Sequence, residues 1–410
     1  MRKILTYAVS ALALASCSSD SLVSDSPANT QAPIAFTAGQ KNITRTALEE
    51  AGFSNFGVWA YKIKSGSFDV VMNNYQVGCA GYGDFESSTL TKGEWFYDGI
   101  GSQILRYWDH STEKTNFYAY APYNSSVNFD VNDKKINVTA TAGYKNTNDF
   151  IYAGTSVEND DYDKKVKLVF RHIGAKVNVA FRENVPGYKV QLIDVTTTDK
   201  SGIQATPAVE TVTGTGSTAV TSYSVGEYNT TSSVTITYDD SATPSTITST
   251  SGATTSPANL MFDIPTTVGE KGLKEFTKNS KTYKVLPEES DNKYAVSPTT
   301  YYAVVQPTDS ETGFTFHISY NLIAEDNGEV VTVRDARVFV PDTQVRWQSN
   351  TSYTYNFTIS QVSSGTTDPT VTPDLADPTV PVGTVVPIVF DGATIEDYKP
   401  NTPSGDIDIK

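Results

Sequence analysis

The stretch FTFHISYNL at residues 314–322 decides the fold class, because apolar and polar side chains alternate along it without a break. Successive side chains of a β-strand point to opposite faces of its sheet, so this period of two predicts a strand with one buried and one solvated face. The Asp-Asn-Gly sequence at residues 326–328 favours a type I′ hairpin turn, after which Val331 and Val333 begin the return.

The same period recurs along the chain. Tyr and Phe alternate with Thr and Asn over residues 353–359, and Val166, Leu168 and Phe170 share one parity. That parity reverses by Val177, which predicts a turn or bulge around residues 173–175, since one inserted residue exchanges the two faces of a strand. Few segments have a helical period, so we predict an all-β chain.

Composition predicts the division of the chain. Hydrophobic residues make up 38% of 410 positions, which is enough for two domains of ordinary size, expected at residues 33–184 and 185–360. Residues 211–257 are rich in Ser and Thr and favour an exposed loop or hairpin region. Residues 361–383 carry repeated Pro, Thr and Asp and favour an extended linker, so residues 384–410 form a C-terminal extension.

The N-terminus has the pattern of an exported lipoprotein. Two basic residues precede an apolar run at residues 4–15 that is too short to span a bilayer. The run ends in Leu-Ala-Ser-Cys, which resembles a lipobox, so we expect residues 1–16 to be a signal peptide cleaved between Ser16 and Cys17. Cys17 would then carry acyl chains such as palmitate, and residues 17–32 would form a flexible tether. The alternative is an ordinary secretory signal followed by an incidental cysteine.

Charge and motifs exclude several function classes. Loss of the two basic residues in the signal changes the formal net charge from −15 to −17, which argues against nucleic acid and anionic lipid as partners. With Cys17 acylated, Cys79 has no intramolecular disulfide partner. His110, His172 and His317 are far apart in sequence and form no metal-binding or catalytic motif. We therefore expect no enzymatic activity, no cofactor and no metal.

Several aromatic and basic motifs follow one another along residues 33–360. They are Phe36, Arg45, FGVWAY at residues 56–61, Tyr107-Trp108 before FYAYAP at residues 117–122, LVFRH at residues 168–172 before Ala175-Lys176-Val177, and Trp347 before Tyr353-Thr354-Tyr355. Their order and spacing resemble those of the fimbrillin family, the type V pilins of gut and oral anaerobes. This resemblance implies two tandem β-sandwich domains of the transthyretin-like, Greek-key type. It also implies a surface-exposed lipoprotein of the outer membrane that is assembled into a fimbrium.

The resemblance further implies maturation by an Arg-specific protease, which removes the first strand and opens a hydrophobic groove. The matching bond here joins Arg45 to Thr46, after a first strand expected at residues 34–37. A neighbouring subunit's C-terminal strand would fill that groove by donor-strand exchange. The alternative is that Arg45 is a solvated loop residue.

The apolar run VVPIVF at residues 385–390 is the candidate donor strand, with Val386, Ile388 and Phe390 as its groove-filling side chains. Pro387 removes one ladder donor, which suits an edge position. The alternative is a terminal strand that packs on its own domain.

Two hypotheses of different classes follow. The first is a fimbrial subunit whose partners are other pilin subunits, the outer-membrane lipid before maturation, and a host or glycan ligand. The second is a monomeric glycan-binding lipoprotein, or a tip or anchor subunit, that is not cleaved. It is motivated by aromatic residues such as Trp95, Trp108 and Trp347, although alternation favours most of these as core residues.

Overall fold

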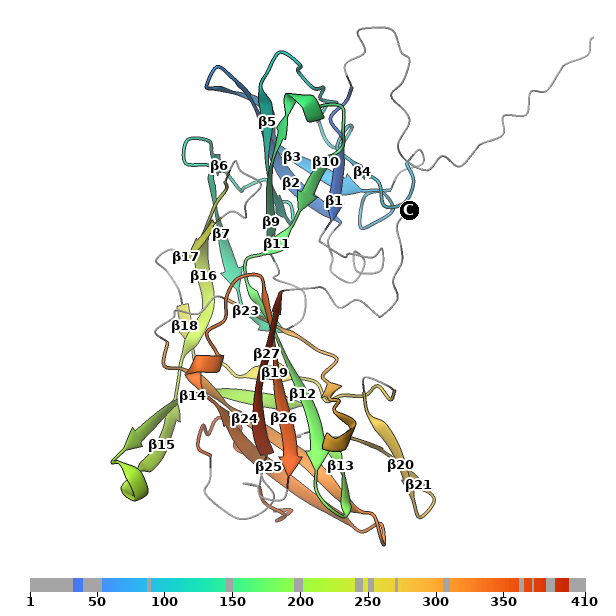
Figure 1. The fold of residues 1–410 in the computed structure, drawn as a ribbon, viewed down its shortest axis with the longest axis vertical. Helices are drawn as coiled ribbons and strands as arrows, with labels where there is room; N and C mark the ends of the chain where they lie inside the picture. The colour runs from blue at the N-terminus through green and yellow to red at the C-terminus, as the bar shows by residue number, and fades with distance from the viewer. Residues whose placement is uncertain are drawn as a thin grey trace, which may run out of the picture.

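The computed structural model describes residues 32–39, 54–86, 90–144, 150–194, 202–239, 246–249, 254–269, 272–304, 310–360, 365–370, 372–380 and 388–397. Regular structure in these ranges is β-strand apart from short 3-10 turns at Asn159–Asp161, Gly216–Thr218, Glu289–Asp291 and Asp342–Gln344. The all-β prediction is therefore confirmed. Figure 1 shows an elongated molecule with two lobes stacked along its long axis.

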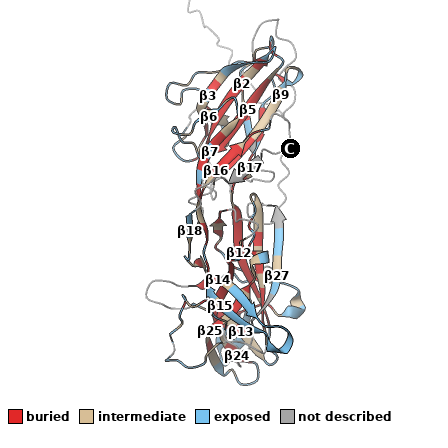
Figure 2. Ribbon diagram, turned by 90° about the vertical axis from the view of Figure 1, so that its left-hand side faces the viewer, coloured by how far each residue is buried: buried red, intermediate tan, exposed pale blue. Residues whose placement is uncertain are grey.

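A six-stranded antiparallel sheet forms the middle of the first lobe. Its strands, in spatial order, are β11 (Arg171–His172), β9 (Ile151–Glu158), β5 (Lys114–Ala121), β2 (Asn55–Lys64), β3 (Ser67–Cys79) and β4 (Trp95–Phe96). Nearly every residue of β2 and β5 is buried, so both faces of this sheet are covered, as the colouring in Figure 2 shows.

One face is covered by β1 (Phe36–Gly39) and β10 (Val166–Val169), which run parallel to each other. Their apolar side chains pack with Phe56, Val58 and Phe117 of the middle sheet in one core. The predicted first strand therefore exists, two residues further along the chain than expected.

The other face is covered by strands from both halves of the chain. They are β6 (Phe129–Asp130), β7 (Lys135–Thr141), β16 (Tyr228–Thr237), β17 (Thr246–Ser249) and β18 (Thr254–Ser256). β7 pairs with β16 from Lys135↔Thr237 to Thr141↔Thr231. Val234 and Ile236 are buried against Trp59, Tyr118 and Tyr120 of the middle sheet.

The prediction of an exposed region at residues 211–257 is wrong for β16. Its apolar side chains cover large aromatic rings that would otherwise face water, which stabilises the pairing. The prediction holds for the projecting hairpin formed by the end of β14 (Ile203–Thr213) and by β15 (Val220–Val225), most of whose residues are exposed.

Two packed sheets form the second lobe. The first holds β8 (Gly143–Tyr144), β12 (Ala175–Asn184), β22 (Ala295–Val296), β23 (Tyr301–Ala303), β26 (Thr351–Ser360) and β27 (Ile388–Asp397). The second holds β13 (Tyr188–Ile193), β14 (Ile203–Thr213), β15, β19 (Leu260–Phe262), β24 (Gly313–Ala324) and β25 (Val330–Val340). The large core lies between them, and β20 (Lys274–Lys278) and β21 (Lys281–Val285) form a separate hairpin.

The parity reversal after Phe170 marks a change of sheet. Phe170 belongs to the first-lobe core and Val177 to the second-lobe core. The chain bends at Ile173 and Gly174, where an added Cβ on Gly174 would lie 2.5 Å from the carbonyl oxygen of Ala303. The predicted turn is present, but it is a passage between lobes. β12, placed before the expected boundary at residue 184, lies in a sheet of the second lobe.

The hairpin of β24 and β25 differs from its prediction in two details. The apolar face of β24 lies in the core as expected, but of the five loop residues 325–329 only Gly328 has a positive φ, so the turn is not type I′. The face expected to be solvated is also buried, because residues 372–380 lie against it. Thr315 and His317 are fully buried there.

Candidate functional site

The segment ending in β1 fills a slot in the first lobe. Ile34 and Phe36 are 2% and 3% exposed. The ring of Phe36 packs edge-on against Phe56, Tyr97 and Phe117, with ring centroids 5.8, 5.9 and 5.8 Å away. Such aromatic packing adds stability beyond the burial of area, so these two side chains anchor the segment.

Main-chain bonds hold the same segment on both sides. The amide of Ile34 donates to the carbonyl of Arg106 at 2.8 Å, and the Trp108 amide donates to the carbonyl of Ala32 at 3.2 Å. On the other side, β1 pairs with β10 from Phe36↔Val166 to Gly39↔Val169. We call the space between residues 106–108 and β10 the β1 slot.

The predicted processing residues lie outside the described residues. Arg45 and Thr46 fall between β1 and β2, and Ser16 and Cys17 precede residue 32, as do the signal peptide and nearly all of the tether. The position of Arg45 in the sequence still matters, because residues 40–53 are the covalent connection between β1 and the rest of the lobe.

The predicted donor strand is paired within its own chain. β27 runs antiparallel to β26, from Ile359↔Ile388 to Thr351↔Asp397, with an irregularity beside Phe357. This arrangement is the alternative given above, in which residues 385–390 form a terminal strand that packs on its own domain. Ile388 and Phe390 lie in β27, but their side chains and the whole of Val386 are outside the described set. β27 is in the second lobe and β1 in the first (Figure 1).

Polar contacts fix the irregular point of β27. Asp391 accepts hydrogen bonds from the hydroxyls of Thr358 and Tyr294, the latter at 3.0 Å, and lies 3.6 Å from Arg182. The guanidinium of Arg182 also lies 4.7 Å from the ring centroid of Tyr294. Since these contacts are partly exposed, they add modestly to the main-chain ladder.

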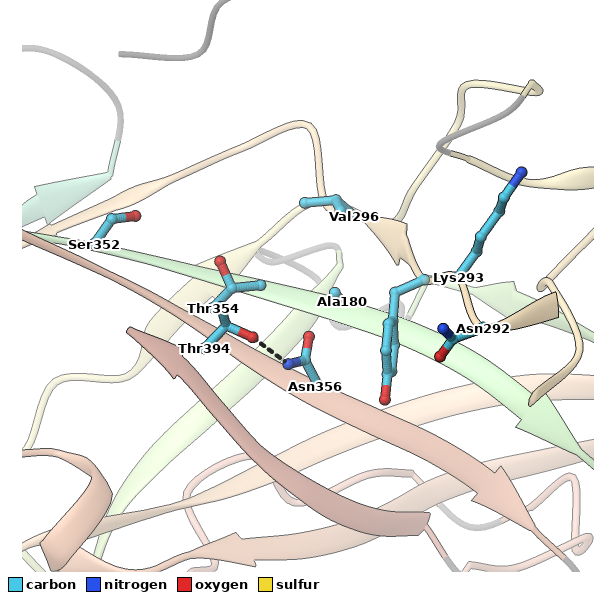
Figure 3. A pocket seen from close by; sticks show the side chains of 9 residues that line it. Ala180, Asn292, Lys293, Val296, Ser352, Thr354, Asn356 and Thr394 are labelled. Atoms are coloured by element: carbon cyan, nitrogen blue, oxygen red, sulfur yellow. Dashed lines mark hydrogen bonds between the residues drawn. The ribbon is translucent and has the colours of Figure 1, made fainter. Parts of the chain in front are cut away.

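An open trough of about 350 Å³ lies beside β27 on the outer face of the sheet (Figure 3). Its lining is mostly small and polar, and Tyr294 is its aromatic side chain. Of the three tryptophans named above, Trp108 and Trp347 are at most 1% exposed and Trp95 is partly buried against the first-lobe core, which matches the expectation that most aromatic residues are core.

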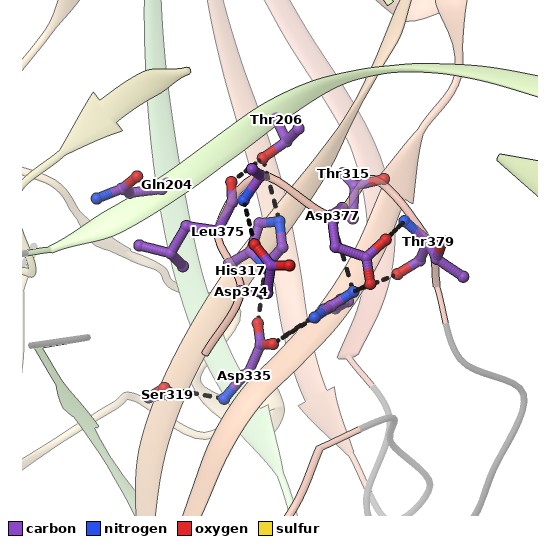
Figure 4. A network of polar contacts seen from close by, with 12 residues as sticks. Gln204, Thr206, Thr315, His317, Ser319, Asp335, Asp374, Leu375, Asp377 and Thr379 are labelled. Carbon is purple, nitrogen blue, oxygen red and sulfur yellow. Dashed lines mark hydrogen bonds and ion pairs between the residues drawn. The ribbon is translucent and has the colours of Figure 1, made fainter. Parts of the chain in front are cut away.

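A second feature, which the sequence analysis missed, is a strap formed by residues 365–370 and 372–380 on the outer face of the sheet that contains β24. Its backbone accepts hydrogen bonds from side chains of the fold: Leu375 from buried Thr206 at 2.5 Å and from partly buried Asn259 at 2.6 Å, and Pro378 from buried Thr315. The segment expected to be an extended linker is therefore docked (Figure 4).

A charged chain secures the end of the strap. Arg337 contacts Asp335 at 2.6 Å and the strap residue Asp377 at 2.5 Å. Burial raises the pKa of Asp377, but hydrogen bonds from Arg337 and Thr379 outweigh it and lower the pKa to about 2. Asp377 therefore keeps its charge, and the strap its ion pair, throughout the range from weakly acidic to neutral pH.

The strap also covers a chain of three polar groups, which are the hydroxyl of Thr206, the imidazole of His317 and the carboxylate of Asp335. Nε2 of His317 lies 3.2 Å from Oγ1 of Thr206, and Nδ1 lies 2.7 Å from Asp335. Hydrolases use such an order of groups, but there the hydroxyl must reach a substrate. Thr206 is 1% exposed and bonded to Leu375, so this arrangement holds the strap.

Within the described ranges, no group of three or more His, Cys, Asp or Glu side chains could hold a metal ion. The same part of the chain contains no helix that is long and apolar enough to cross a membrane.

Comparison with known proteins identifies the class and then the family. Residues 1–18, which include Ser16 and Cys17, match the model of the prokaryotic membrane lipoprotein lipid attachment site. Together with the fold, this defines an all-β bacterial lipoprotein with edge strands near both ends of its chain. Residues 44–373 match the model described as fimbrillin-like. The chain therefore belongs to the fimbrillin-like family, and the resemblance is confirmed.

Solved structures of bacterial proteins also match the chain. Two are assigned provisionally to cell adhesion. The one from Bacteroides uniformis is 14% identical and covers 90% of this chain and 98% of its own, with a TM-score of 0.40. The one from Bacteroides ovatus is 14% identical, covers 91% and 100%, and has a TM-score of 0.42. The fimbrial anchor protein Mfa2 from Porphyromonas gingivalis is 8% identical, covers 80% and 92%, and has a TM-score of 0.25. No curated protein matches the chain. Because these scores are below 0.5, the assignment rests on the family model.

Proposed function

We propose that the protein is a structural subunit of a type V cell-surface fimbrium that contributes to adhesion. It is exported to the outer membrane as a lipoprotein acylated on Cys17, cleaved after Arg45, and polymerised with other pilin subunits by donor-strand exchange. The observation that carries this proposal is the β1 slot, in which a short N-terminal segment inserts Ile34 and Phe36 into the core.

Cleavage after Arg45 would cut the connection between β1 and β2. Departure of β1 would then leave an apolar cavity where Ile34 and Phe36 had packed, with unpaired main-chain groups at Arg106, Trp108 and along β10. Exposed apolar surface and an open strand edge both favour binding of an incoming strand, which restores the ladder and fills the cavity.

β27 is suited to be the donor because it lies at the edge of its sheet. Its departure breaks one ladder, with β26, and a neighbour's slot supplies a main-chain ladder in return. The pairing in this structure then represents a subunit before assembly.

The first test is Arg45→Lys. This variant keeps the positive charge but replaces the arginine after which an Arg-specific protease would cut. The wild-type protein released from cells should begin at Thr46 and form a ladder on gels that boiling dissolves. Arg45→Lys should retain acylated Cys17 and run as one band. A wild-type protein that also keeps acylated Cys17 and runs as one band would overturn the proposal and favour an uncleaved tip, anchor or glycan-binding lipoprotein.

A second test concerns the donor. Ile388→Asp combined with Phe390→Asp should abolish the ladder, because unpaired carboxylates would have to enter an apolar groove. Ile395→Asp is the matched control, since Ile395 lies in the same strand and is 60% exposed. Normal filaments from the double variant would refute the donor assignment.

A further inference from the structure

A tetrapeptide at the start of β1 and a tetrapeptide at the start of β27 share one sequence pattern. Residues 33–36 read Pro-Ile-Ala-Phe, and residues 387–390 read Pro-Ile-Val-Phe. Three of four residues are identical, at two places more than 350 positions apart. The first of these tetrapeptides occupies the β1 slot.

The slot accounts for which residues are shared. Ile34 and Phe36 are the two buried side chains of the segment, whereas Ala35 is only partly buried and Pro33 is exposed. The one difference between the tetrapeptides, Ala35 against Val389, therefore falls at the partly exposed position and not at either buried one.

The backbone of the slot also accepts proline in the first position. Its bonds use the carbonyl of Ala32, the amide of Ile34 and the carbonyl of Ala35, which accepts from Val166 at 2.8 Å. None of these bonds uses the amide of residue 33. Pro387 would therefore lose no hydrogen bond in this place, although it would interrupt most ladders.

We infer that residues 387–390 of a neighbouring copy occupy the β1 slot in the register of residues 33–36. Ile388 takes the pocket of Ile34, Phe390 takes the pocket of Phe36, and the strand runs parallel to β10. This inference rests on the proposed function and specifies the partner segment and its alignment.

The proposed register also places a charged pair across the strands, at the residue after Phe390. Thr37 lies opposite Lys167 of β10, and both are exposed, so Asp391 of the donor would lie opposite Lys167. Opposite charges on facing residues favour this alignment. A shift by two residues would put Gly392 or Ile388 in the pocket of Phe36. Gly392 would leave the space of the phenyl ring empty, and Ile388 would fill only part of it.

The test is a register-specific disulfide between copies. Lys167→Cys is combined with Asp391→Cys, and the controls combine Lys167→Cys with Val389→Cys or with Ala393→Cys, the positions two residues away. Each variant is oxidised after assembly on cells and boiled without reductant. Native Cys79 is fully buried, and burial raises its pKa to about 11, so it should contribute little to cross-linking.

The expected result is a covalent ladder for the Asp391→Cys combination and single bands for both controls. A covalent ladder from either control instead would overturn the register while leaving donor-strand exchange intact. Heat-sensitive ladders without any cross-link would place the donor elsewhere and also overturn the inference. Absence of every ladder, in the parent too, would mean that the proposed function itself fails.

A second measurement covers the case in which cysteine variants fail to assemble. Phe390→Ala should lower the temperature at which the ladder dissociates, because it empties the pocket of Phe36. Val389→Ala recreates Pro-Ile-Ala-Phe and should leave that temperature nearly unchanged. Equal effects of the two variants would contradict the inference.

Discussion

At the scale of single residues, Glu183 shows how the fold changes the chemistry of one carboxylate. It lies near the end of β12, 2% exposed, accepts a hydrogen bond from the amide of Val185 at 2.9 Å, and lies 3.8 Å from Lys189. Burial raises its pKa to about 7, although the Val185 amide and Lys189 act in the opposite direction. The charged form is therefore disfavoured in the folded state.

This shift predicts a pH dependence of stability. Because the folded-state pKa exceeds the ordinary value of 4.5, the stability that Glu183 contributes is complete below pH 4.5 and lost as the pH rises through 7. Glu183→Gln should remove up to about 3 kcal/mol of the difference in unfolding free energy between pH 5 and pH 8. Urea unfolding at both pH values measures it. Glu275→Gln on exposed β20 is the control, and an unchanged slope in Glu183→Gln would contradict the assignment.

At the scale of elements, the strap depends on side chains of the sheet that it covers. Gly365 fits closely, since an added Cβ would lie 2.5 Å from Val333, and Thr366 exchanges main-chain bonds of 2.9 and 2.8 Å with Arg334. Arg337 then holds Asp377. The strap is therefore anchored on β25 at both of these places, unlike a free linker.

Removing Arg337 should destabilise the second lobe. Arg337→Met leaves buried Asp335 without its guanidinium partner, which should cost about 3 kcal/mol of unfolding free energy in urea titrations. It should also speed proteolysis within residues 365–380. Arg346→Met is the control, because its pair with Asp342 is exposed and should contribute less than about 1 kcal/mol. Equal losses in the two variants would disprove the role of Arg337.

At the scale of the whole molecule, β16 joins the lobes. It is reached through the second lobe but completes a sheet of the first, and the hydroxyl of Tyr238 just beyond it donates to the carbonyl of Ala119 in β5 at 2.9 Å. The first lobe therefore lacks part of its cover until residues of the second half are present, and we expect the two lobes to unfold cooperatively.

A substitution in β16 should therefore destabilise the first lobe. Ile236→Asp would bury a charge against the aromatic layer and should cost about 4 kcal/mol or more. Hydrogen exchange of amides in β2 and β5 measures the effect. Val220→Asp on β15 is the matched control, because Val220 is 61% exposed and contacts solvent. Unchanged exchange in β2 and β5 after Ile236→Asp would show that the lobes are independent.

The sequence by itself determined what depends on local period and local motif. Alternation over residues 314–322 and 353–359 identified core-facing side chains, and the family motifs predicted β1 and the fimbrillin-like assignment. Arg45, Cys17 and the donor strand also came from motifs and remain predictions.

Only the tertiary structure decided which partners these segments take. Thr206 and Leu375, which meet at the strap, are 169 positions apart, and Ser-Thr-rich β16 finds its partners in the first lobe. The polar side chains of Thr206, Thr315 and His317 are buried under the strap. Their alternation in the sequence would be the same if water, and not the strap, supplied their hydrogen-bond partners. A buried polar group needs a hydrogen-bond partner, and the local sequence determines which groups are polar. The partner can come from any part of the chain that lies close in space, so the tertiary path of the chain determines which partner each group obtains.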